Sequence, residues 1–176
     1  PFGDDDVSGV SYVIVDPIVN VFFSTFTVKN SAQAGIKYQY CTRQGSMESL
    51  DIVTCGVGIE ATATSQMVID TINVNACFRG LDFTNVHYTL ITGCAIIDTL
   101  VDHAIIADNW TNSQVVGSFI LNSAGDGMNL TNCSKLVLTI AMAENGGQGI
   151  ELVSGNSDIS IGPLRSQDNA GDGIKF

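Results

Sequence analysis

The sequence predicts an all-β fold, a parallel β-helix (β-solenoid) of about seven coils of 22–26 residues. Three observations predict it. A short phrase recurs at a nearly constant interval, each copy alternates apolar and polar residues, and no segment shows helical periodicity over three turns. We expect residues 1–176 to form a single domain, which their number allows, and to be a fragment of a longer chain.

The recurring phrase is a small residue followed by an apolar residue, any residue and a second apolar residue. Its copies begin at Gly9, Gly35, Gly58, Gly80, Ala104, Gly127, Gly149 and Gly173. Alternate side chains of a strand point to opposite faces, so each copy predicts a half-buried strand with two inward positions. The first inward column is Val10, Ile36, Ile59, Leu81, Ile105, Met128, Ile150 and Ile174, and the second is Tyr12, Tyr38, Ala61, Phe83, Ala107, Leu130, Leu152 and Phe176.

The residues before each phrase predict a bend and an inner corner. Three places before the small residue stand Asp6, Ala32, Cys55, Cys77, Val101, Ala124, Gly146 and Ala170, which after the first copy are small or apolar. Two places earlier, Asn30, Asn75, Asn122 and Asp168 recur. Asn and Asp tolerate the left-handed conformation that bends require, and stacked Asn side chains can bond one another between coils.

The rest of each repeat contains further short β-rich runs, at 22–28, 86–91, 115–121, 136–140 and 159–161. Gly and Asn residues separate these runs, as is typical of strands joined by tight bends. A unit of 22–24 residues with about three short strands matches one coil of a solenoid. Such coils stack at the spacing of parallel strands, about 4.8 Å.

The charge balance excludes one class of partner. The chain has a net charge of −11 with seven Lys and Arg residues, and nucleic-acid binding depends on cations that replace phosphate counterions. We therefore expect no nucleic-acid partner. Anionic membrane surfaces are disfavoured for the same reason, and no run of 18 apolar residues predicts insertion into a bilayer.

The five cysteines, Cys41, Cys55, Cys77, Cys94 and Cys133, are an odd number without a Cys-x-x-Cys pair. Such a set predicts neither a disulfide framework nor a zinc site, and buried thiols are the favoured interpretation. Cys55 and Cys77 fall in one inward column on adjacent coils. A disulfide is geometrically allowed there, and a packed thiol pair is the alternative.

Three phrases carry a resemblance to a known family: residues 122–130 (NSAGDGMNL), 144–152 (ENGGQGIEL) and 168–176 (DNAGDGIKF). In these residues the chain resembles the right-handed parallel β-helix superfamily, which includes pectate lyases, polygalacturonases, alginate epimerases and bacteriophage tailspikes. The resemblance covers nearly the whole chain and implies a right-handed coil. It departs from the polygalacturonases, because Gly-Asp-Gly occurs twice without a Gly-His-Gly or an Arg-Ile-Lys.

Within the superfamily, the chain looks most like a bacteriophage tailspike or receptor-binding appendage. This implies a protein of the virion tail, or an extracellular one, that attaches the virus to its host by binding host surface polysaccharide. Some such proteins also cleave the polysaccharide as glycosidases, and whether this chain is an enzyme is left open. The resemblance also implies a homotrimer and contacts with other virion proteins. Two alternatives stay open: a secreted polysaccharide lyase, hydrolase or epimerase, and a structural β-helical rod without catalysis.

Stacking turns sequence columns into surface ladders. The column just before the small residue reads Ser8, Ala34, Val57, Arg79, His103, Asp126, Gln148 and Asp172, and we expect it to face outward. Asp126 with Glu151 or Asp172 would then be the catalytic acid and base, because glycosidases pair two carboxyl groups across the scissile bond. Arg79 and His103 would bind the substrate.

Each assignment has a plainer interpretation. Asp126 in Gly-Asp-Gly is also what a turn at the start of a strand requires. Trp110 is predicted to lie in a loop, as a platform for a sugar ring or as a cover for the core. Asp98, Asp102 and His103 form a patch that suits either calcium or a solvated edge. No metal site is therefore assigned, and calcium is the one cofactor left open.

Overall fold

The computed structural model describes residues 6–8, 12–15, 21–41 and 44–176, with side chains from residue 22 onward. Over these ranges the chain forms sixteen β-strands and no helix that is long and apolar enough to cross a membrane. The strands in chain order are β1 (Asp6–Ser8), β2 (Tyr12–Val15), β3 (Val21–Lys29), β4 (Ala34–Gln39), β5 (Gly45–Val53), β6 (Val57–Asp70), β7 (Asn73–Asn75), β8 (Arg79–Thr92), β9 (Ala95–Ile97), β10 (Ile105–Leu121), β11 (Met128–Thr131), β12 (Ser134–Ala143), β13 (Ile150–Ser154), β14 (Ser157–Ile161), β15 (Arg165–Gln167) and β16 (Ile174–Lys175).

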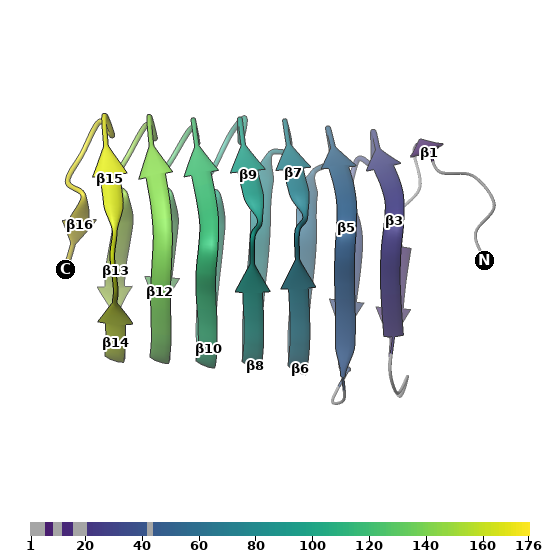
Figure 1. Cartoon of the computed structure of the whole chain (residues 1–176), viewed down its shortest axis with the longest axis horizontal. Coiled ribbons are helices and arrows are strands. Elements are labelled where there is room, and N and C mark those ends of the chain that lie inside the picture. Colours follow the sequence, from purple (N-terminus) through teal and green to yellow (C-terminus); the bar gives the residue numbers. More distant parts are fainter. Residues whose placement is uncertain (1–5, 9–11, 16–20, 42–43) are drawn as a thin grey trace.

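The strands stack in parallel as a right-handed β-solenoid of about seven turns, which confirms the predicted fold. Sheet 1 contains β2, β4, β11, β13, β16 and the first parts of β6, β8 and β10. Sheet 2 runs through β3, β5, β6, β8, β10, β12 and β14, and sheet 3 through β1, β3, β5, β7, β9, β10, β12 and β15. In Figure 1, sheets 2 and 3 lie in front and their strands point upward, whereas the strands of sheet 1 lie behind and point downward.

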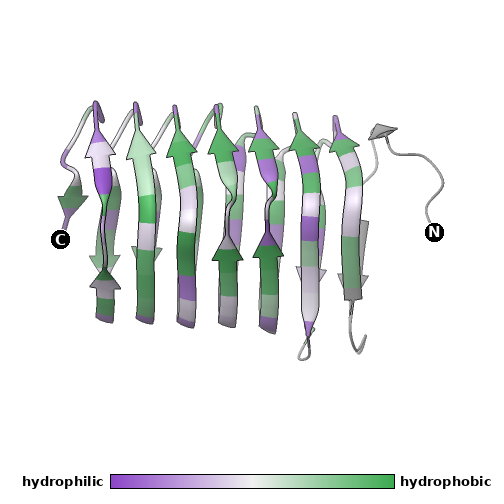
Figure 2. Ribbon diagram, in the orientation of Figure 1, coloured by the Kyte–Doolittle hydropathy of each residue, from purple (hydrophilic) through white to green (hydrophobic). Residues whose placement is uncertain are grey.

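Columns of apolar side chains from the three sheets fill the interior. The predicted column in sheet 1 is confirmed from Ile36 through Ile59, Leu81, Ile105 and Met128 to Ile150, and the second predicted column is confirmed from Tyr38 to Leu152. Sheets 2 and 3 add Met47, Ile69, Ile91, Val115 and Leu138, and Ile52, Val74, Ile96, Ile120 and Met142. Burying one such side chain contributes about 1.5–3 kcal/mol. Figure 2 shows the hydrophobic residues that recur along the strands of every coil.

Each coil bends at residues with positive φ, a region that non-glycine residues enter at a cost in free energy. The upper bend, between sheets 3 and 1, uses Asn30, Thr54, Ala76, Asp98, Asn122, Glu144 and Asp168, with φ from 52° to 57°. The prediction is confirmed for Asn30, Asn122 and Asp168, whereas Asn75 is wrong by one position because Ala76 makes the bend. The expected bonds between coils are also present, since Asn122 Nδ2 donates to Asp98 Oδ1 at 2.7 Å.

Two members of the predicted columns are wrong. Tyr12 pairs with Ile36, and Ile14 pairs with Tyr38, so the first phrase was placed two residues out of register. A period of two looks the same after a slip of two residues, and the apolar alternation around Tyr12 therefore did not distinguish the registers. Gly9 and Val10 lie outside the described residues. Phe176, predicted to face inward, is 90% exposed because it follows the last residue of β16.

Candidate functional site

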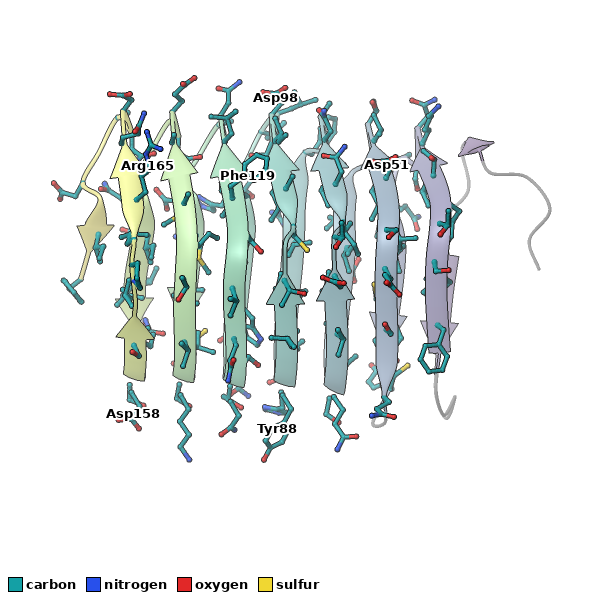
Figure 3. All side chains as sticks on the ribbon, in the orientation of Figure 1. Asp51, Tyr88, Asp98, Phe119, Asp158 and Arg165 are labelled. Atoms are coloured by element: carbon teal, nitrogen blue, oxygen red, sulfur yellow. The ribbon has the colours of Figure 1, made fainter. Side chains whose placement is uncertain are left out.

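The upper turn is the segment between the upper bend and sheet 1, and its length varies from coil to coil. The small residue of the phrase follows Ala76 by four residues, Asn122 by five and Asp98 by six. Asp98 is labelled at the upper bend in Figure 3. The strands on either side keep their pairing, so the extra residues project from the stack without disturbing it.

The residue directly after each upper bend forms a stacked column, which we term the turn column: Ser31, Cys55, Cys77, Thr99, Ser123, Asn145 and Asn169. The predicted corner column is correct at Cys55 and Cys77. It is wrong at five positions, whose residues are exposed: Ala32, Val101, Ala124, Gly146 and Ala170. The side chain of its first member, Asp6, lies outside the described part of the chain. The prediction counted three residues back from the small residue of each phrase. Where the upper turn is longer, that count ends one or two residues after the turn column.

Polar members of the turn column bond the coil before them. The Ser123 backbone N–H donates to Asn145 Oδ1 at 3.1 Å, and the Asn145 N–H donates to Asn169 Oδ1 at 3.1 Å. Where the column contains cysteines, the Cys55 N–H donates to Cys77 Sγ at 3.3 Å. Buried backbone donors at the turn are thereby satisfied by the next coil.

Arg79 lies at the start of β8 and joins two coils. Its Nε donates to Asp102 Oδ2 at 2.7 Å, and its Nη1 lies 3.0 Å from Asp82 Oδ2. Burial acts to lower the pKa of Arg79, but the hydrogen bonds and charges of Asp102 and Asp82 together raise it. The predicted substrate-binding residue is thus held in a fixed position, with its side chain 43% exposed.

His103 connects the Arg79 cluster to Asp126. The Asp126 backbone N–H donates to His103 Nδ1 at 2.7 Å, and His103 Nε2 lies 3.2 Å from Asp102 Oδ1. His103 Nδ1 also lies 3.2 Å from Asp126 Oδ2. Arg79, Asp102, His103 and Asp126 therefore form one continuous polar chain across neighbouring coils.

Asp126 does not face outward as expected, because its side chain is 8% exposed. Its Oδ1 accepts from the Gln148 N–H at 2.7 Å, and its Oδ2 accepts from Asn129 Nδ2 at 3.2 Å. Gly147 of the next coil covers it, since a Cβ there would collide with Asp126 Oδ1. In the same way Gly125 covers His103. A glycine in the following turn thus allows the next coil to cover the side chain. The expectation that the column faces outward is therefore wrong at Asp126.

Glu151 lies one coil beyond Asp126, and both carboxylates bond the same amide. Asn129 Nδ2 donates to Glu151 Oε2 at 2.9 Å as well as to Asp126. Lys175 Nζ lies 2.6 Å from Glu151 Oε1, and this hydrogen bond raises the pKa of Lys175. Asp172 is exposed on the following coil, where its backbone N–H donates to Gln148 Oε1. The structure therefore joins Asp126 to Glu151, with Asn129 between them.

Trp110, expected on a loop, is instead fully buried in β10. It pairs with Val86 of β8, and its ring meets Phe83 edge to face with centroids 5.3 Å apart. A buried ring is closed to a sugar, so the proposed platform is wrong and the alternative role in the core is correct. Among the described residues, no group of three or more His, Cys, Asp or Glu side chains could hold a metal ion; calcium binding stays a prediction.

A surface groove of about 550 Å³ crosses four coils at the upper turns, and we term it the Arg79 groove. Its charged lining consists of Arg79 with Asp102 and of Lys37, which lies 2.7 Å from Glu60. Its apolar lining includes Phe78, which is 55% exposed. The groove thus combines an aromatic face with fixed charged groups, as sites for polar ligands do.

Phe78 was not singled out from the sequence, although a signal was present. The residue directly after the turn column is large at Phe78 and Leu100, of which Phe78 is aromatic, and is small in the other coils, at Ala32, Gly56, Ala124, Gly146 and Ala170. Its backbone N–H donates to Cys55 O at 3.0 Å, which directs the side chain away from the interior. A large aromatic residue in an outward column of small residues indicates a role at the surface rather than in packing.

The stacked parallel coils define a right-handed β-solenoid with a groove that has charged and aromatic lining along its upper turns. The chain belongs to the right-handed β-helix family, whose model, described as "Right handed beta helix region", matches residues 11–163. A comparison with curated protein sequences finds no match.

Two solved structures share the fold. The enzymatically active domain of tailspike protein 2 from bacteriophage CBA120 is similar over 88% of this chain, with a TM-score of 0.78 and 17% identity. The periplasmic alginate epimerase AlgG is similar over 89% of this chain, with a TM-score of 0.51 and 12% identity. The chain spans 26% of the tailspike chain and 60% of the epimerase chain. At these identities the likeness shows the fold alone.

Proposed function

We propose that this chain is the polysaccharide-binding part of a tailspike-like adsorption protein, and that the Arg79 groove is where it binds host surface polysaccharide. The fold is shared with a domain of a phage tailspike and with an enzyme named for the polysaccharide alginate. As part of the same proposal, the protein is a component of the virion tail, outside the host cell. It forms a homotrimer there and contacts other virion proteins. The outward apolar side chains of Val116, Phe119 and Val137 on sheets 2 and 3 would suit contacts between subunits.

The Arg79 groove carries this proposal. A sugar ring has an apolar face that packs on an aromatic side chain and hydroxyl groups that bond charged side chains. Phe78 offers the first kind of contact, and the Arg79–Asp102 and Lys37–Glu60 pairs offer the second. Because each cation is already paired with a carboxylate, its position is set before a ligand arrives, which lowers the entropy cost of binding.

Binding of a panel of bacterial surface polysaccharides by the unmodified protein tests the proposal directly. We expect the Phe78→Ala variant to bind the recognised polysaccharide at least about tenfold more weakly, the equivalent of about 1.4 kcal/mol. Titration calorimetry or biolayer interferometry measures this affinity. The matched control is Tyr88→Ala, since Tyr88 is an aromatic residue that is 60% exposed and lies at the edge of the stack opposite Asp98 and the upper bend (Figure 3).

Tyr88→Ala should leave the affinity unchanged. Equal losses in the two variants would show that the groove is not the site, and failure of the unmodified protein to bind any polysaccharide would favour a structural rod. Both outcomes would contradict the proposal.

We propose polysaccharide binding for this chain and do not propose cleavage. An inverting glycosidase needs room for a water molecule between its two carboxyl groups, whereas the Asn129 amide occupies the space between Asp126 and Glu151. Catalytic roles for Asp126, Glu151 and Asp172 therefore stay predictions. Release of oligosaccharides by the unmodified protein, together with loss of this release in Asp126→Asn, would support them.

A further inference from the structure

Cys55 and Cys77 occupy equivalent positions on adjacent coils. The pairing of β5 with β7 ends at Val53 and Asn75, and each cysteine follows two residues after its member of this pair. Beyond them, the Phe78 N–H donates to Cys55 O at 3.0 Å. The cysteines therefore stack directly, with their Cα atoms about 4.8 Å apart, as neighbouring parallel strands are. This spacing lies within the range of about 4.4–6.8 Å found across disulfide bonds.

The two thiols are chemically unequal. A hydrogen bond from the Cys77 side chain lowers the pKa of Cys55 to about 7, although burial acts in the opposite direction. The same bond, together with burial, raises the pKa of Cys77. Burial also raises the pKa of Cys94, to about 11, and that of Cys133. The thiolate is the form that attacks a disulfide, so Cys55 is the most nucleophilic of these four residues.

Cys55 is 2% exposed and lies next to a depression on the surface. It lines a depression of about 280 Å³ at the upper turns, together with Asn30, Thr54 and Phe78. The Gly35 backbone packs closely on the sulfur, because a Cβ at that position would lie 3.3 Å from Cys55 Sγ and 2.6 Å from Ile52 Cγ2. Cys77 does not line this depression. Of the two cysteines, Cys55 is thus the one that borders a depression on the surface.

We propose that Cys55 and Cys77 form a reactive thiol pair that accepts a low-molecular-weight disulfide and closes a covalent bond between adjacent coils. In the first step the Cys55 thiolate attacks one sulfur of the reagent, forming a mixed disulfide and releasing one thiolate. In the second step Cys77 gives its proton to that thiolate and attacks Cys55 Sγ, which releases the second thiolate, and this takes up a proton from solvent. Both protein thiols are oxidised, and one reagent disulfide is reduced to two thiols.

The test uses the native chain and 2-hydroxyethyl disulfide, a small uncharged reagent. We expect the folded protein to lose two hydrogen atoms in mass, and peptide mapping to find Cys55 joined to Cys77. Under pseudo-first-order conditions Cys55 should react at least about tenfold faster than Cys94 or Cys133. This rate comparison needs no variant. A first adduct on Cys94 or Cys133, or equal rates at all the cysteines, would overturn the proposal.

Variants separate the two steps. Cys77→Ser should stop at a stable mixed disulfide on Cys55, whereas Cys55→Ser should abolish reaction at Cys77. Cys133→Ser is the matched control, since Cys133 is also a buried thiol and its loss should leave the bond between Cys55 and Cys77 unaffected. Circular dichroism verifies that each variant is folded. Disulfide formation at Cys77 in folded Cys55→Ser would contradict the assigned order.

Discussion

At the scale of single residues, Trp110 is the clearest difference between expectation and structure. The residue was expected in a loop, but its neighbours Asn109 and Asn112 have positive φ and each makes one bend of a continuous strand. Between two such bends a short segment still points one side chain into the interior, and in this coil that side chain is the indole. The pattern of turn residues therefore predicted the bends and not the strand between them.

Replacing Trp110 with alanine should lower the free energy of unfolding by about 3–5 kcal/mol, because the fully buried indole and its contact with Phe83 are both lost. Urea unfolding followed by circular dichroism measures the change. Tyr88→Ala is the control for loss of an exposed ring, and it should stay within about 0.5 kcal/mol of the parent. If both variants unfold at the same urea concentration, Trp110 does not carry the packing assigned to it.

At the scale of elements, the upper turns lie close to the next coil. The room for a side chain at the small residue of the phrase therefore differs from copy to copy. A Cβ at Gly58 would lie 2.5 Å from Gly80 O and 2.5 Å from Val74 Cγ1. A Cβ at Gly173 would lie 3.3 Å from Ser166 Oγ and 3.5 Å from Ser166 Cβ. The same position in the phrase is thus blocked by backbone in one coil, whereas in another a Cβ would meet only the side chain of Ser166.

Gly58→Ala should therefore destabilise the protein by about 1–3 kcal/mol, the usual range for overpacking against a rigid neighbour. Gly173→Ala, at the equivalent position, should change the stability by less than about 0.5 kcal/mol. Thermal unfolding of the two variants side by side gives the comparison. A larger loss in Gly173→Ala than in Gly58→Ala would contradict the close approach seen between the coils at Val74.

The element scale also explains what the sequence could predict of the site. Arg79, His103 and Asp126 do lie on successive coils. Arg79 contacts His103 through Asp102, and His103 contacts Asp126 directly. The direction of the Asp126 side chain could not be predicted. It depends on Gly147, one coil later. The alternation of residues within a strand gives no information about a contact with the next coil.

At the scale of the whole molecule, each coil contacts only the coils before and after it. Stability in such a stack is a sum over neighbours, and coils covered on both sides are held more firmly than those covered on one side. Strands β6, β8 and β10 pair on both sides, whereas β14, β15 and β16 each pair on one side among the described strands. The repeat made this architecture predictable, since a column of apolar residues every 22–24 residues has few other ways to be buried.

Amide hydrogen exchange of this chain should consequently be slowest in β6, β8 and β10 and fastest in β14 to β16, with a gradual change between them. Exchange followed by mass spectrometry on overlapping peptides resolves this profile. A sharp step within the stack would indicate two separately folding units and contradict the prediction of a single domain, whereas uniform protection would contradict neighbour-by-neighbour stabilisation.

The unequal length of the upper turns has a consequence for how such a protein changes over generations. Insertions at Asp98 or Ala76 alter the outline of the exterior while the hydrogen-bonded scaffold beneath is conserved in its geometry. New surface shapes are therefore accessible through small changes in loop length, without redesign of the interior. Variation among natural homologues should concentrate at these turns, leaving the apolar columns nearly constant.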